Sequence, residues 1–174
     1  SFLPRAIHAF TKQHQHAQIS LQVLPSREVV DQVVGQRCDL GFIAEPNTYP
    51  SPRGERLLRS SMLCALPRGH RLHPQAVGSR HHLDAIFDAH GVTRQLQLET
   101  QLSASMCAFV ELGAGVALVD TISALEYRGD GIVFRPFEPA VEVDFSMLMS
   151  AQSRPSRIQQ SFMQHMREFV ASEV

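Results

Sequence analysis

The sequence predicts an α/β fold, and two observations carry this prediction. Helical and strand patterns alternate along the first third of the chain, and residues 112–120 have the pattern of a helix that ends on glycine and passes into a short strand. The uninterrupted apolar run from Val116 to Val119 is typical of a parallel strand covered on both faces. Asp120 would stand at the carboxyl end of that strand, where open α/β sheets bind ligands. The pattern therefore indicates small-molecule binding.

The composition is that of a folded chain with its own core. The 174 residues are 44% hydrophobic and carry a formal net charge of -1, so the chain lacks the basic character that binding to a phosphate backbone requires. Cys38, Cys64 and Cys107 form no CxxC pair, which favours small core residues in a reduced, cytoplasmic protein. No apolar run reaches the roughly 18 residues of a membrane span, so we expect no membrane association.

The first third of the chain predicts helix, strand, helix and strand in turn. An amphipathic helix begins at Ser1 and runs to about His14, and residues 19–24 alternate between apolar and polar side chains as a half-buried strand does. Ser26 can cap a second helix with a valine-rich face, and residues 40–44 form a short strand. This alternation predicts a parallel sheet.

The rest of the chain continues the alternation after a loop rich in proline between Glu45 and Gly54. The elements expected there are strands at residues 57–66, 96–99, 116–119, 132–134 and 141–149, and helices at residues 81–90, 103–112, 121–127 and about 158–169. Ser103 or Ser105 is the expected cap of the second of these helices.

Short motifs follow one another in a defined order: Leu24-Pro25-Ser26, residues 37–41 (RCDLG), residues 65–72 (ALPRGHRL), residues 112–116 (LGAGV) and residues 133–137 (VFRPF). Together, over nearly the whole chain, their order and spacing resemble the effector-binding domain of LysR-type transcriptional regulators. The likeness is greatest to regulators of amino-acid and opine metabolism. Those regulators carry a similar Leu-Pro-Ser turn, a Gly-His-Arg-Leu sequence and a Val-Asp or Ile-Asp pair at a strand end.

This resemblance implies two Rossmann-like lobes of the type 2 periplasmic-binding-protein architecture, joined by two crossover strands, with an effector in the cleft between them. Lobe I would comprise residues 1–64 and 143–174, and lobe II residues 65–142. The implied function is ligand sensing by a transcription regulator, with a small polar, amino-acid-like effector and assembly into homodimers or homotetramers. DNA would be bound only through an N-terminal winged helix-turn-helix, which we expect to be absent from this chain.

Two departures from the family pattern are also expected. The family's effector domain opens with a strand and a polar loop, for which we find no counterpart before Ser1. A turn, a helical piece and a strand are missing near Val77-Gly78, because residues 74–79 are too few to supply the strand that the second lobe requires.

Ser103 and Ser105 precede or open a helix whose free N–H groups and positive dipole end suit a ligand carboxylate. Ser26 and Arg27 stand at the same kind of position in the first lobe. Ordinary helix capping is the alternative for each serine. The resemblance favours ligand binding for Ser103 and Ser105.

Glu45 and Asp120 each follow a predicted strand. Together the two carboxylates could bind an ammonium or guanidinium group of the effector through charge-assisted hydrogen bonds. A solvated or capping role is the alternative for each, since Asp120 is also well placed to cap the helix that follows it.

We expect no metal, no cofactor and no catalytic activity. The nine histidines have no zinc-site spacing, and the sequence contains no nucleophile elbow, no phosphate-binding GxxxxGK[ST] loop and no HExxH helix. Two alternatives to a regulator share the same architecture: a solute-binding protein of a transport system, and an enzyme on this fold.

Overall fold

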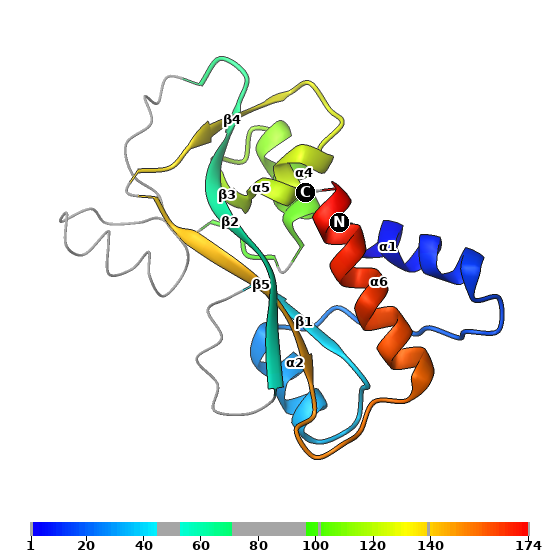
Figure 1. Ribbon diagram of the computed structural model, residues 1–174. Coiled ribbons are helices and arrows are strands. Elements are labelled where there is room, and N and C mark those ends of the chain that lie inside the picture. The colour runs from blue at the N-terminus through cyan, green and yellow to red at the C-terminus, as the bar shows by residue number, and fades with distance from the viewer. Residues whose placement is uncertain (1, 45–52, 71–96, 101, 139, 174) are drawn as a thin grey trace. The chain divides into compact units, whose positions relative to one another are not determined.

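The computed structural model describes residues 2–44, 53–70, 97–100, 102–138 and 140–173. The chain divides into two compact units, Ser1–Arg59 with Asp144–Val174, and Ser60–Val143. Two strands pass from one unit to the other, namely β2 (Arg53–Pro67) and β5 (Glu142–Met149) (Figure 1). Within the described residues helices and strands do not alternate strictly, because two helices and then two strands follow one another at the start of the chain. Glu45, the helix expected at 81–90 and the region of Val77-Gly78 lie outside the described residues.

In the first unit, α1 (Phe2–Gln13) packs beside α6 (Arg157–Glu173) (Figure 1). Phe10 is only 1% exposed, and its ring meets that of Phe162 edge-on, with the centroids 5.0 Å apart. His165 Nε2 lies 2.9 Å from the carbonyl oxygen of Ala6. Since a carbonyl oxygen can only accept, this ring nitrogen carries the hydrogen. The apolar stripes predicted for both helices are thus the surfaces that join them.

Strand β1 (Gly41–Ala44) has helices on both of its faces. It pairs antiparallel with β5. Helix α2 (Ser26–Val34) covers one face, where Val33 and Ile43 are buried in a cluster with Val30 and Leu148. On the opposite face the ring of Phe145 meets that of Phe2 in α1, with the centroids 6.0 Å apart. The alternation of side chains along a strand therefore sorts the two helices to opposite faces.

The strand expected at residues 19–24 is not formed. Ile19, Leu21 and Val23 remain 41%, 50% and 60% exposed, and no described strand pairs with this segment. The alternating pattern was present, but a strand also needs a partner for its backbone groups. The prediction of a strand at 96–99 is likewise wrong for its described part, since residues 97–100 have no regular structure.

In the second unit, β2 lies between β3 (Ala117–Asp120) and β4 (Ile132–Pro136). Helix α4 (Ser103–Glu111) packs on this sheet through Cys107 and Val110, and α5 (Thr121–Glu126) follows β3 directly. Both β3 and β4 run antiparallel to β2. The parallel arrangement predicted for 116–119 is therefore wrong among the described pairs, because this strand's neighbour is one of the two that cross between the units.

The three cysteines are free, with Cys64 and Cys107 buried as small core residues. Burial raises the pKa of both the Cys64 and the Cys107 thiol, so these groups stay protonated at neutral pH. No helix in the described ranges is long and apolar enough to cross a membrane.

Candidate functional site

Asp120 ends β3 and is the N-cap of α5. Its Oδ1 accepts a hydrogen bond from the Ser123 backbone N–H at 2.8 Å, and its Oδ2 accepts from the Ser123 hydroxyl at 2.6 Å. The capping role, one of the two left open by the sequence, is therefore the role that the structure gives this carboxylate. The sequence signal for this capping role was the position of an aspartate between a predicted strand and a predicted helix.

Ser103 and Asp120 are brought together. The Ser103 hydroxyl donates to Asp120 Oδ2 at 3.4 Å, so the carboxylate that caps α5 also orients the first side chain of α4. Both residues lie in the second unit. Of the six residues predicted for the site, these two are the pair for which a direct contact is described.

The first turn of α4 presents donors without helical acceptors. The N-cap is Leu102, which makes no side-chain cap, and the first helical bond runs from the Met106 N–H to the Leu102 carbonyl at 3.1 Å. The expectation that Ser103 or Ser105 caps this helix is wrong, because Ser103 is already helical and its hydroxyl bonds Asp120. The backbone N–H groups that precede that of Met106 in the helix can therefore donate hydrogen bonds to an anion, which the positive dipole end also attracts.

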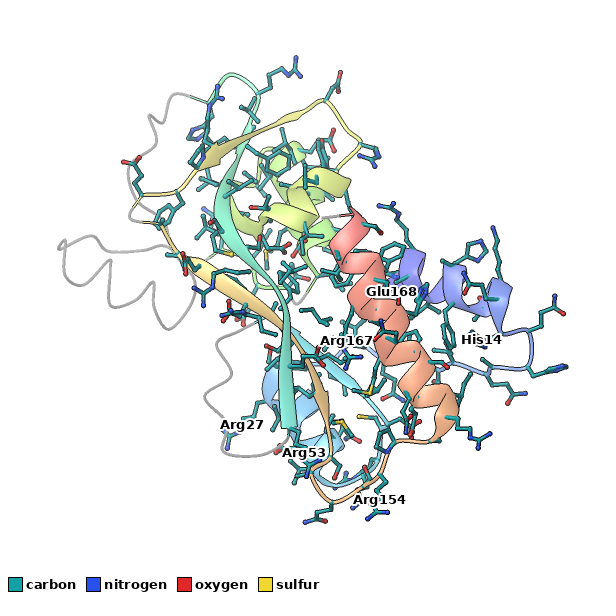
Figure 2. All side chains as sticks on the ribbon, in the orientation of Figure 1. His14, Arg27, Arg53, Arg154, Arg167 and Glu168 are labelled. Carbon is teal, nitrogen blue, oxygen red and sulfur yellow. The ribbon has the colours of Figure 1, made fainter. Side chains whose placement is uncertain are left out.

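Ser26 and Arg27 are the first two residues of α2, in the first unit. Pro25 is the N-cap and no side chain caps the helix, so the capping expected of Ser26 is wrong. Proline ahead of the helix fixes the extended backbone from which α2 begins. The Arg27 side chain projects from this first turn (Figure 2). Ser105 is part-buried on α4.

Ser60 belongs to the same region and was not singled out from the sequence. It is 9% exposed on β2, and its hydroxyl has no hydrogen-bond partner among the described residues. Met62 pairs with Asp120 across the sheet, so Ser60, two residues earlier, shares the face of Asp120 at the diagonal spacing of about 7–8 Å. A buried hydroxyl without a partner is unusual and marks a place where a polar ligand group could bond. Only the register of β2 against β3 reveals this placement.

Loss of the Asp120 carboxylate is expected to destabilise the second unit measurably. Asp120→Ala removes the cap of α5 and the acceptor for Ser103, so we expect a loss of about 0.5–2 kcal/mol in the free energy of unfolding. Urea denaturation followed by circular dichroism would measure it. Asp120→Asn retains one acceptor oxygen and should lose less; equal losses in the two variants would argue against the capping role.

The described residues contain no group of three or more His, Cys, Asp or Glu side chains arranged to hold a metal ion. The predicted binding residues are serines, one arginine and carboxylates, of which Asp120 is already engaged by Ser123 and Ser103. What this part of the chain offers chemically is hydrogen bonding to a small polar molecule.

Comparison with known proteins gives consistent results. The family model described as the LysR substrate binding domain matches residues 1–171. The chain is 29% identical over 187 residues to the transcriptional activator protein LysR of Escherichia coli (strain K12), covering 96% of this chain and 60% of that protein. It is 29% identical over 176 residues to the octopine catabolism/uptake operon regulatory protein OccR of Rhizobium meliloti, covering 92% of this chain and 59% of that protein.

A solved structure shows the same fold. The regulatory domain of CcmR from Synechocystis PCC6803, in complex with 2-PG, superposes with a TM-score of 0.82 at 16% identity, covering 99% of this chain and 92% of that one. This likeness confirms the predicted α/β architecture of the type 2 periplasmic-binding-protein kind. The chain spans about 60% of the length of the curated relatives that it matches, and these relatives are transcriptional regulators. Since the family model covers residues 1–171, the chain belongs to the LysR substrate-binding domain family, as its motifs predicted.

Proposed function

We propose that this chain is the ligand-sensing part of a LysR-type transcription regulator that binds a small polar, amino-acid-like effector. The observation that carries the proposal is the family match over residues 1–171. The name of OccR supports the ligand class, since octopine is an amino-acid derivative. DNA binding would belong to a winged helix-turn-helix outside this chain, and the regulator would be a cytoplasmic, non-enzymatic homodimer or homotetramer without metal or cofactor.

The second unit offers the groups for the effector's carboxylate. In this proposal the N–H groups of the first turn of α4 bind the carboxylate, and the Ser103 hydroxyl exchanges its long 3.4 Å bond to Asp120 for a bond that it donates to the effector. The Ser60 hydroxyl, for which the described part of the chain supplies no partner, lies on the same face of the sheet as Asp120 and would bond a further polar group. Ser26, Arg27, Glu45 and Ser105 remain predicted contacts.

The proposed mechanism is a shift between two arrangements of an oligomer. The crossover strands β2 and β5 would act as hinges, and the effector would favour the arrangement to which it binds more tightly. Its differential affinity limits the shift, and coupling energies between sites are typically about 1–3 kcal/mol. Because the shift depends on the affinity of the effector, the first measurement is effector binding.

A thermal-shift screen of the full-length regulator against acidic, basic and hydroxylated amino acids would test the ligand class. At a concentration about 100 times the dissociation constant, the right ligand should add about 2.7 kcal/mol of stability. Ser103→Ala should weaken binding by about 0.5–1.5 kcal/mol, the worth of one hydrogen bond.

Ser153→Ala, an exposed serine in the loop before α6, is the matched control. A shift that Ser103→Ala reduces and Ser153→Ala leaves unchanged would support the site. If no amino-acid class produced a shift, the amino-acid ligand would be wrong. A shift of equal size in both variants would remove Ser103 from the contacts.

A further inference from the structure

One peptide group of β2, the group between Ser61 and Met62, is held at both of its polar atoms. The Ser61 carbonyl oxygen accepts a hydrogen bond from the Thr121 hydroxyl at 2.8 Å. The Met62 N–H donates to the Val141 carbonyl at 2.9 Å. Because the carbonyl and the N–H of a planar trans peptide point to opposite sides, the two bonds hold β2 from both sides.

This peptide group lies where β2 leaves the second unit. The second unit begins at Ser60, one residue before Ser61, whereas β2 extends back to Arg53 in the first unit. Among the described pairs, the ladder between β2 and β3 ends at Met62, whose partner is Asp120. The bond to the Ser61 carbonyl therefore fixes β2 to the second unit one residue beyond that ladder. While it is made, bending of the crossover strand has to begin ahead of Ser61.

The donor of this bond is the chain neighbour of the carboxylate that organises the candidate site. Asp120 accepts hydrogen bonds from Ser103 and Ser123, and Thr121 is the first residue of α5. We call Asp120 and Thr121 the β3–α5 corner. One of its side chains contacts the proposed effector site and the other contacts the crossover strand. A displacement of the corner changes both sets of contacts together.

We propose that Thr121 is a positioning residue whose hydroxyl makes the crossover strand β2 follow movements of the β3–α5 corner. The threonine side chain is short and has restricted rotation about χ1, so its hydroxyl moves with the backbone at the start of α5. In the proposed function, Ser103 leaves Asp120 when the effector binds, which changes the forces on this corner. The role of Thr121 in regulation rests on that function, whereas its link to β2 rests on the hydrogen bond to Ser61.

The test is native-state hydrogen exchange of individual backbone amides in the intact protein, with no amino acid added. The Met62 amide reports directly, because it belongs to the held peptide group. Thr121→Val keeps the branched shape and removes the hydroxyl. We expect the Met62 amide to exchange about 2- to 10-fold faster in this variant, which corresponds to the loss of one hydrogen bond. Thr121→Ser retains a hydroxyl and should restore most of the slow exchange.

Two controls separate a local effect from general destabilisation. Thr11→Val removes another threonine hydroxyl that donates to a carbonyl, that of His8 at 3.0 Å, and should leave exchange at Met62 unchanged. The Leu112 amide, which donates to the Ala108 carbonyl at the end of α4, reports on the second unit as a whole. Its exchange should not change in Thr121→Val.

A double-mutant cycle tests whether β2 follows the corner. Ser123→Ala removes the 2.6 Å bond from the Ser123 hydroxyl to Asp120 and so loosens the corner. This substitution should speed exchange of the Met62 amide in the wild type and have a smaller effect when Thr121 is already valine.

Faster exchange at Met62 without a change at Leu112, together with effects of Ser123→Ala and Thr121→Val that do not add, would support the proposal. Unchanged exchange at Met62 in Thr121→Val, an equal increase at Leu112, or additive effects in the cycle would each overturn it. No effector is used in these measurements. A failed amino-acid screen would therefore disprove the proposed ligand class and leave the result for Thr121 unaffected.

Discussion

Replacing Phe10 with alanine is expected to destabilise the protein by about 3–5 kcal/mol, the usual cost of emptying a buried phenylalanine site. Phe10 is 1% exposed and sits between helices α1 and α6. Its ring contacts those of Phe162, His14 and His165, with centroids 5.0, 4.2 and 5.4 Å away. The variant loses all these contacts, and rigid helices cannot close the space.

Urea denaturation of wild type and Phe10→Ala would measure the change. Leu112→Ala removes a side chain that is 82% exposed, so its effect should stay within about 0.5 kcal/mol. If Phe10→Ala does not fold, Phe10→Leu retains most of the volume and should give an intermediate loss. A loss below about 1 kcal/mol for Phe10→Ala would contradict a close-packed contact between α1 and α6.

Replacing Gly41 with alanine is expected to destabilise the protein by about 1–3 kcal/mol through overpacking. A Cβ atom at Gly41 would lie 2.6 Å from Val29 Cγ1 and 2.8 Å from Val33 Cγ2. Val33 is fully buried, and the branched valine side chains have little rotameric freedom on a helix. Glycine is therefore required here by the close approach of α2 to β1.

A double-mutant cycle would test this cause. Val29→Ala removes the nearer methyl group, so Gly41→Ala should cost less in that background than in the wild type. Chemical denaturation of the four proteins gives the interaction energy. An equal cost in both backgrounds would show that the contact with Val29 is not the source of the loss.

The helices were the most predictable part of this fold. The stripes that predicted α1, α2 and α6 are local patterns, and each places its apolar residues on one side of the helix whatever the partner is. Gly35 and Gly113, just after α2 and α4, were visible in the same way as signals for the ends of these helices. The helical stripes do not identify the architecture; the order and spacing of the family motifs predicted it.

Strand pairing could not be predicted in the same way. Residues 19–24 have the alternation of a strand, yet they have no described partner, and β3 pairs antiparallel with β2 although its composition indicated a parallel strand. Alternation reports which faces of a segment could be buried. It carries no information on which distant segment supplies the hydrogen bonds.

The same difference between local patterns and long-range contacts applies to the candidate site. The sequence by itself determined that Asp120 ends a strand and begins a helix, and that Ser103 opens another, because these are properties of neighbouring residues. Only the tertiary structure decided that the Ser103 hydroxyl bonds Asp120, that Ser60 shares the face of Asp120 on the sheet, and that Arg56 and Arg59 share Asp144. The contact between Arg59 and Asp144 joins residues 85 positions apart, and such contacts follow from strand register and helix packing, which are set by the whole core rather than by any local pattern.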